Sequence, residues 1–341
     1  MNTTSNIYFK NSKARRKYRI SMLVLLGLAL LITYGLFTYN NPVPIDSPSF
    51  LPVVKRRKNA IIAMALAAIC QSIGSIVFQT TTNNRIITPS ILGFEAIYTT
   101  INTAMMFIFG ISSFVENNSK VYFIFQILLM VGVSLLLFMG IFYKKGANIE
   151  LMLLVGVILG QGLRSISSFM RRLLSPSEFD ILQARLFASV NNSNPEYYLM
   201  SALIIGIVGL ILIANAKKLN ILALGKDVAT NLGLDHKKLT VLVLIGVSIL
   251  ISISTALVGP MTFFGFLIAS LTYEMAYTFD HKRMLAMASL LGYVILSGSY
   301  FIMNHVFNAN GVVSVLIELI GGLAFLVMIF RKEKIWLNYI M

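Results

Sequence analysis

Long apolar runs separated by short polar stretches divide the chain from one end to the other. A helix that crosses a bilayer needs about 20 apolar residues, and ten runs reach or approach that length. The runs predict membrane-spanning helices over residues 20–38, 60–79, 91–111, 121–142, 151–170, 197–215, 239–258, 264–279, 284–304 and 312–330. Because no stretch between them is long enough for a soluble domain, we expect one all-α membrane domain over residues 1–341.

Composition and charge agree with this pattern. Charged residues make up 12% of the 341 residues, whereas a soluble domain carries about 25%. With the N-terminus inside and ten crossings, most Lys and Arg fall in loops on the cytoplasmic side, as the positive-inside rule requires. We therefore expect residues 1–19 to form a basic cytoplasmic tail and both termini to be cytoplasmic. This bias explains the net charge of +15 without a nucleic-acid partner. The expected surroundings of the chain are membrane lipid.

One polar stretch, residues 222–238, keeps helical character between two apolar runs. Its apolar residues recur at helical spacing, and they are Leu222, Leu224, Val228, Ala229 and Leu232. Gly233 supplies a helix stop, since glycine adopts the left-handed C-terminal position without steric penalty. The pattern predicts a short amphipathic helix whose apolar face packs on a soluble partner, on its own protein or on lipid headgroups.

The same stretch resembles the coupling helix of the iron-chelate and vitamin B12 family of ABC importer permeases. The matching residues are Leu224, Gly225, Ala229, Leu232 and Gly233. Three further motifs at separate places also resemble that family, namely Asn84–Gly93 around Pro89, the turn Gly259–Gly265, and Asp280–Arg283. In the family, the coupling helix sits in a cleft of the ATP-hydrolysing subunit and transmits its closure to the membrane helices.

The resemblance implies a fold, a function and partners. The fold is the type II ABC importer permease, and the function is ATP-driven import of ferric siderophores across the bacterial cytoplasmic membrane. The partners are a second permease subunit, two ABC ATPase subunits and an extracytoplasmic siderophore-binding receptor. Ser297 and the stretch 308–311 depart from the common family residues, which resembles the branch with two different permeases. The same fold also suits haem or cobalamin.

A basic cluster breaks the positive-inside rule. Lys55, Arg56, Arg57 and Lys58 lie between the first two predicted spans, on the outer side in this topology. Either the first span is miscounted and the cluster is cytoplasmic, or the four cations dock an acidic partner. In the resembled family, basic residues here contact carboxylates of the receptor, although this chain lacks the usual proline. Such exposed pairs chiefly aid encounter and register.

The fifth predicted span carries polar residues on one helical face, namely Gln161, Arg164, Ser165 and Ser168. An arginine inside a bilayer costs at least ~2.5 kcal/mol on insertion scales, so it should face protein or water. Arg164 then has two possible roles. It forms a structural ion pair with Glu274 or Glu318, or it lines the translocation path of an anionic substrate.

The sequence offers no set of residues for enzymatic chemistry. Lys226 follows Gly225, but the glycine that a phosphate-binding loop needs five residues earlier is missing. The three histidines and the single cysteine, Cys70, are scattered along the chain. We expect no catalytic residue, no metal site and no cofactor, with ATP hydrolysis left to separate subunits. The alternative class is an ion-coupled secondary transporter, whose carboxylate relay would need Glu274 and Glu318.

Overall fold

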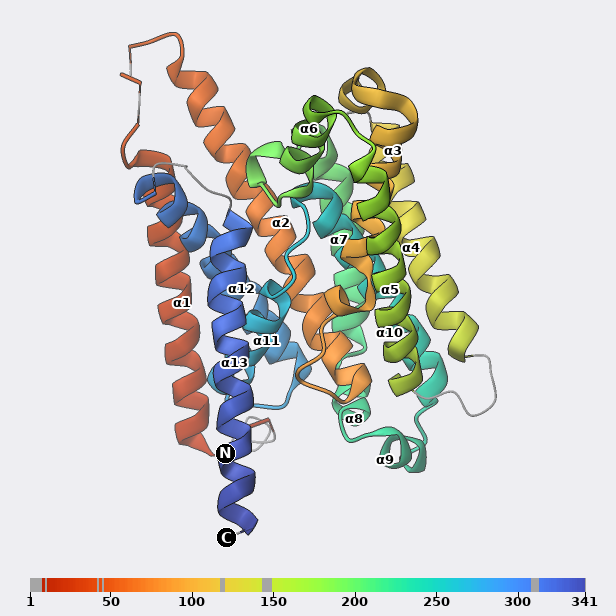
Figure 1. The fold of residues 1–341 in the computed structure, drawn as a ribbon. Helices are drawn as coiled ribbons and strands as arrows, with labels where there is room; N and C mark the ends of the chain where they lie inside the picture. Colours follow the sequence, from red (N-terminus) through yellow and green to blue (C-terminus); the bar gives the residue numbers. More distant parts are fainter. Residues whose placement is uncertain are drawn as a thin grey trace.

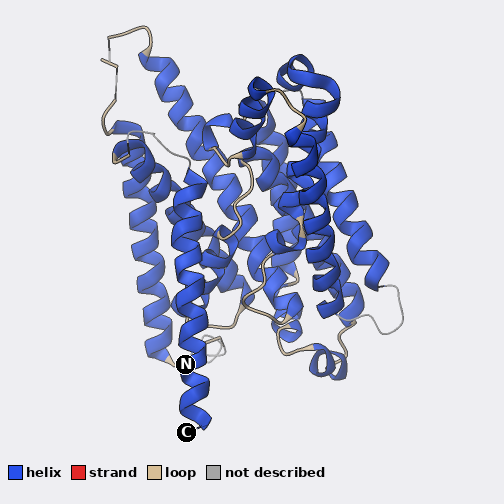
Figure 2. Ribbon diagram, in the orientation of Figure 1, coloured by secondary structure: helices blue, strands red, loops and turns tan. Residues whose placement is uncertain are grey.

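The computed structural model describes residues 8–9, 11–41, 43–44, 46–116, 120–142, 149–307 and 313–340, so the departure at 308–311 lies outside the described residues. The described chain is almost entirely helical and contains no strand (Figure 2). This architecture confirms the predicted all-α class. Each helix keeps its backbone hydrogen bonds within itself, which is what a chain in lipid requires.

A helix coincides with each predicted span (Figure 1). These helices are α1 (Ser12–Thr38), α2 (Phe50–Thr82), α3 (Phe94–Glu116), α4 (Lys120–Phe142), α5 (Ile149–Arg172), α7 (Tyr198–Ala214), α10 (His236–Val258), α11 (Phe264–Met275), α12 (His281–His305) and α13 (Val313–Ile340). Seven are long and apolar enough to cross a membrane, while α4, α11 and α13 contribute shorter apolar segments to the described residues. The predicted count of about ten is therefore approximate.

Short elements connect the long helices. They are η2 (Pro89–Leu92), α6 (Pro176–Leu186), η3 (Val190–Asn192), η4 (Pro195–Tyr197), α8 (Ala216–Leu222) and α9 (Lys226–Asn231). Pro89 begins η2, and the third span, predicted from residue 91, starts at Phe94 after the left-handed Gly93 with φ 95°. The second span starts earlier than predicted, because α2 begins at Phe50 rather than at residue 60.

The core is built around α2, which packs most extensively on α10 and α12. From Ala60 onward nearly all its residues are buried, including Ser72 and Ser75. A Cβ at Gly292 of α12 would overlap Ser72 Oγ, and one at Gly265 of α11 would overlap Ser75 Oγ. Small residues therefore bring these helices close together, as is common where lipid supplies no hydrophobic drive for association.

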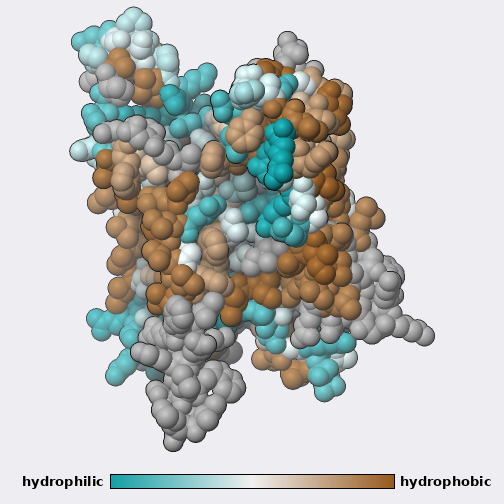
Figure 3. Space-filling view, viewed as in Figure 1, coloured by the Kyte–Doolittle hydropathy of each residue, from teal (hydrophilic) through white to brown (hydrophobic). Residues whose placement is uncertain are grey.

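The bundle has two distinct ends (Figure 1). The α9 end carries α8 and α9, and α1 begins and α13 finishes there. The α6 end carries α6 and the start of α2. Figure 3 shows hydrophobic side chains over much of the middle of the visible face, with hydrophilic groups toward the ends and also in a hollow near its centre.

Candidate functional site

The stretch predicted to couple to an ATPase lies at the α9 end. The predicted range 222–238 contains the helix α9, but residues 236–238 already belong to α10. Gly233 has φ 80° and its N–H donates to the Thr230 carbonyl at 2.9 Å. The Leu234 N–H donates to the Ala229 carbonyl at 3.0 Å. This is a Schellman motif, and it confirms that Gly233 ends the helix.

The apolar side chains of this stretch face two directions. Leu222 and Ala229 are buried in their own chain. Leu224, Val228 and Leu232 are 57%, 46% and 60% exposed, and we call these three residues the α9 patch. Ala229 therefore packs on its own protein, one of the three surfaces expected for the apolar face, and the α9 patch is the surface open to a partner. Large exposed apolar groups gathered in one place mark interaction sites.

Gly225 and Asp235 fix the two ends of this loop. Gly225 precedes α9 with φ 95°, a conformation that suits glycine. Asp235 Oδ1 accepts from the Lys238 backbone N–H at 3.0 Å and begins α10. Its Oδ2 also pairs with Lys238 Nζ at 3.1 Å. The backbone hydrogen bond, with the side-chain contact of Lys238, lowers the pKa of the Asp235 carboxyl below its usual value.

A polar network ties α8 to α2 and α12. Asn220 of α8 accepts from the backbone N–H of His281 at 2.8 Å and from its Nδ1 at 2.7 Å. His281 Nε2 lies 2.7 Å from Thr80 Oγ1 on α2. Asn220 Nδ2 donates to Asp280 Oδ1 at 3.3 Å, and Arg283 donates to Asp280 Oδ2 at 2.6 Å. The network borders a cavity of about 830 Å³ that Leu224 also lines.

The basic cluster at the start of α2 lies at the α6 end, opposite the α9 patch (Figure 1). Lys55, Arg56 and Lys58 are exposed, but Arg57 is half-buried. Arg57 Nη1 donates to the carbonyls of Leu36, Phe37 and Tyr39 at 3.0–3.2 Å, and Nη2 donates to that of Asn40 at 3.0 Å. Arg57 thus holds the C-terminal carbonyls of α1, and the other three side chains form the open surface.

The polar face of α5 is exposed on the surface of the chain. Gln161, Arg164, Ser165 and Ser168 are all exposed, and Ser165 Oγ donates back to the Gln161 carbonyl at 3.0 Å. Gly160 on the neighbouring face touches Gly93, since a Cβ at Gly160 would lie 3.1 Å from Gly93 Cα. The structure thus places these four residues on one open face of α5.

Arg164 lines a polar pocket of about 380 Å³ between α3, α5, α6 and α13. Of the two proposed partners of Arg164, Glu318 lines the same pocket and Glu274 does not. Glu95 also lines it, and Thr262 Oγ1 donates to Glu95 Oε2 at 2.7 Å. Sequence reasoning missed Glu95, although a carboxylate just after Gly93-Phe94 inside an apolar run was a visible signal.

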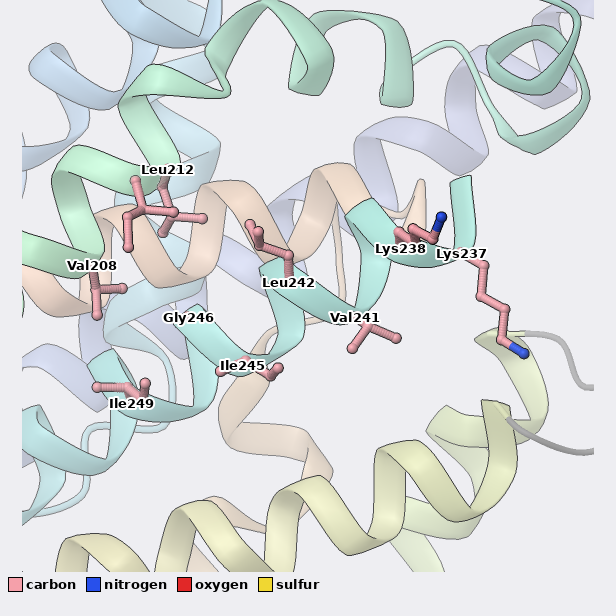
Figure 4. Close-up of a pocket in the computed structure, with 10 residues that line it drawn as sticks. Val208, Leu212, Lys237, Lys238, Val241, Leu242, Ile245, Gly246 and Ile249 are labelled. Carbon is pink, nitrogen blue, oxygen red and sulfur yellow. The ribbon is translucent and has the colours of Figure 1, made fainter. Parts of the chain in front are cut away.

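A mainly apolar groove of about 590 Å³ lies between α7 and α10 (Figure 4). Val208 and Leu212 line it from α7 and Ile249 from α10, while Lys237 and Lys238 lie at one end. A polar ligand there would lose water and gain few hydrogen-bond partners. The pocket beside α5 is therefore the better candidate for a polar substrate.

Known proteins match this chain over nearly all the helices described above. Residues 20–331 match a family model described as the FecCD transport family. The chain belongs to the FecCD transport family. This match confirms the relationship predicted from the four separated motifs, and it identifies the chain as a multi-pass membrane permease.

Individual relatives agree with this placement. This chain is 52% identical over 327 residues to the petrobactin import system permease protein FatC of Bacillus anthracis, with 96% of this chain and 92% of that one covered. It is 36% identical to the petrobactin import system permease protein YclO of Bacillus subtilis, covering 94% and 100%. A solved metal-chelate type ABC transporter in an inward-facing conformation superimposes with a TM-score of 0.79, at 21% identity and covering 92% and 100%.

Proposed function

We propose that this chain is the permease subunit of an ATP-driven ABC importer that carries ferric siderophores across the bacterial cytoplasmic membrane. The observation that carries this proposal is the 52% identity to a petrobactin import permease over 96% of the chain. Its partners are a second, different permease subunit, two ATPase subunits and an extracytoplasmic siderophore-binding receptor. ATP is hydrolysed on the ATPase subunits, and this chain does no chemistry itself.

Coupling to the ATPase is assigned to the α9 patch. Leu224, Val228 and Leu232 stand exposed at the tip of the molecule, where a soluble subunit can bury them. Gly225 and Gly233 supply the backbone turns that present them, and Ala229 anchors α9 to its own chain. Behind the patch, Asn220 and His281 connect α8 to the long helices. A displacement of α9 is therefore transmitted through α8 to α2 and α12 by hydrogen bonds.

The other two surfaces follow from their places in the fold. Lys55, Arg56 and Lys58 at the α6 end dock the receptor, with Arg57 holding α1 beneath them. The translocation path runs along the exposed face of α5 that carries Gln161, Arg164, Ser165 and Ser168, and the second permease closes it from the other side. Loose binding on such a face suits a substrate that has to leave again.

Transport in proteoliposomes tests the proposal. The four-subunit complex with its receptor should accumulate ferric petrobactin when ATP is present on the ATPase side, and should stop when the ATPase is inactivated. Accumulation driven by a proton or sodium gradient without ATP would show a secondary transporter instead. Failure with ferric petrobactin but success with haem or cobalamin would correct the substrate.

The α9 patch gives a second test in the same system. Leu232→Ser and Leu224→Ser remove apolar area that the ATPase buries, so ATP-driven uptake should fall about tenfold or more while the amount of folded permease stays unchanged. The matched control is Asn231→Ser, an exposed polar position on α9. Unchanged uptake in both leucine variants would show that the ATPase contacts another surface.

A further inference from the structure

Four charged side chains surround the pocket beside α5. Glu95 comes from α3, Arg164 and Arg171 from α5, and Glu318 from α13. Arg164 and Glu318 lie within α5 and α13, while Glu95 stands in the first turn of α3 and Arg171 in the last turn of α5. Ionisable groups within membrane helices are expensive to place and mark functional sites. The pocket therefore calls for a ligand or partner that satisfies both signs of charge.

The charges do not neutralise one another by direct pairing. Within the described residues, neither glutamate forms an ion pair with Arg164 or Arg171. Glu95 Oε2 accepts from Thr262 Oγ1, but Glu95 Oε1 is buried without a hydrogen-bond partner. Arg171 Nε is also buried without a partner. A buried polar atom left open in this way indicates that something absent from the lone chain completes it.

The signs of these groups indicate the chemistry of the missing ligand. A purely anionic chelate would be attracted by the arginines but repelled by two carboxylates in the same pocket. A ligand that carries cationic nitrogen beside its anionic iron-binding groups satisfies both. Carboxylates accept N–H groups, and hydrogen bonds to charged partners are the stronger ones.

We propose that Glu95 and Glu318 bind cationic nitrogen of the transported chelate, while Arg164 and Arg171 face its anionic, iron-bearing part. This inference rests on the proposed function and deepens it, because it names a charge pattern that the substrate must have. Thr262 holds Glu95 in place through its hydroxyl and acts as a positioning residue. The pocket is then a selective contact point on the path, next to the weakly polar face of α5.

Two ferric chelates test the proposal when they share their iron-binding groups and differ in one feature. One carries free amines that are ammonium ions at neutral pH, and the other has the same amines acetylated. In proteoliposomes, Glu95→Gln and Glu318→Gln keep side-chain volume but remove the charge. Each should lower the initial uptake rate of the ammonium chelate about tenfold and change that of the acetylated chelate less than about twofold. Glu274→Gln, outside the pocket, is the matched control and should change neither rate.

The possible outcomes are separable. Equal loss for both chelates overturns the proposal, and so does no loss for either. Loss of the second permease from the purified Glu95→Gln or Glu318→Gln complex also overturns it, since the carboxylates then pair across the subunit interface. A wild-type complex that moves no ferric chelate rejects the proposed function itself, before any variant is compared.

Discussion

At the scale of single residues, neighbours of the same charge have different roles. Arg56 and Arg57 are adjacent in the basic cluster, yet only Arg57 turns back onto α1. It donates to the carbonyls of Leu36 and Phe37, which have no partner within α1, and to those of Tyr39 and Asn40 just beyond the helix. A cation at a helix C-terminus also opposes the negative end of the helix dipole. Arg57 therefore stabilises the α1–α2 corner.

Replacing each arginine by methionine separates these roles. Arg57→Met should destabilise the folded permease by about 1–2 kcal/mol, the low end for bonds to a charged donor because the site is half-exposed. Arg56→Met should leave stability unchanged and slow receptor association at low salt. Detergent thermal denaturation and receptor-binding kinetics measure the two effects. The assignment fails if Arg56→Met proves the more destabilising of the pair.

Residues whose role follows from backbone stereochemistry were predictable from the sequence. Gly233 acts on local geometry, so it was placed correctly at the end of a helix. For Ala229, the sequence left the packing surface open, because a six-residue helix is too short for periodicity to fix its orientation. Glu95 was missed because its meaning comes from Arg164 and Glu318, which reach it only through the fold.

At the scale of elements, α8 depends on side-chain hydrogen bonds from other helices. Asn220 Oδ1 accepts two hydrogen bonds from His281, which is itself buried against Thr80. Only seven residues long, α8 lacks the length to be stable alone. Its orientation is therefore set by α2 and α12 rather than by its own propensity.

Asn220→Ala should release α8 from those helices. Removing the amide strands a buried donor of His281, at a penalty of about 1–3 kcal/mol. Hydrogen exchange of the α8 backbone should rise, and fewer chelates should be imported per ATP hydrolysed. The control is Asn215→Ala, since Asn215 Nδ2 bonds only to the Ile211 carbonyl of the preceding turn. If both variants exchange alike, the network does not hold α8.

Element positions were more predictable than element ends. Every predicted span found its helix, because long apolar runs leave few alternatives in lipid. The start of α2 was placed ten residues too late, because the spans were predicted from apolar residues alone. Lys55 to Lys58 are charged but are good helix formers, so the helix extends through them. The contact between η2 and α5 could not be predicted from the sequence, because it depends on the tertiary structure.

At the scale of the whole molecule, the two proposed partner surfaces lie at opposite ends of the bundle. The α9 patch lies at one end and the exposed cations of α2 at the other (Figure 1). An importer needs this separation, because its receptor and its ATPase work on opposite sides of the membrane. The face of α5 between them is left open by the lone chain.

Cysteine labelling tests this arrangement in cells. A membrane-impermeant maleimide should label Arg56→Cys from outside, whereas Leu232→Cys should react only after the cells are permeabilised. The native Cys70 is fully buried and should stay unlabelled until the protein is denatured, so it serves as an internal control. Labelling of Arg56→Cys only after permeabilisation would place the basic cluster on the cytoplasmic side and show that the first span is miscounted.

The glycine contact between the α2–α3 connection and α5 has a mechanical consequence. Gly93 and Gly160 meet backbone to backbone, with no side chain between them. Interlocked side chains have to leave their rotamers before one element slides along another, and two glycines have none to unlock. The contact therefore allows α5 to rotate or shift along the α2–α3 connection while the two backbones stay in contact. A larger residue at either position would restrict this motion of α5, the helix that carries Arg164.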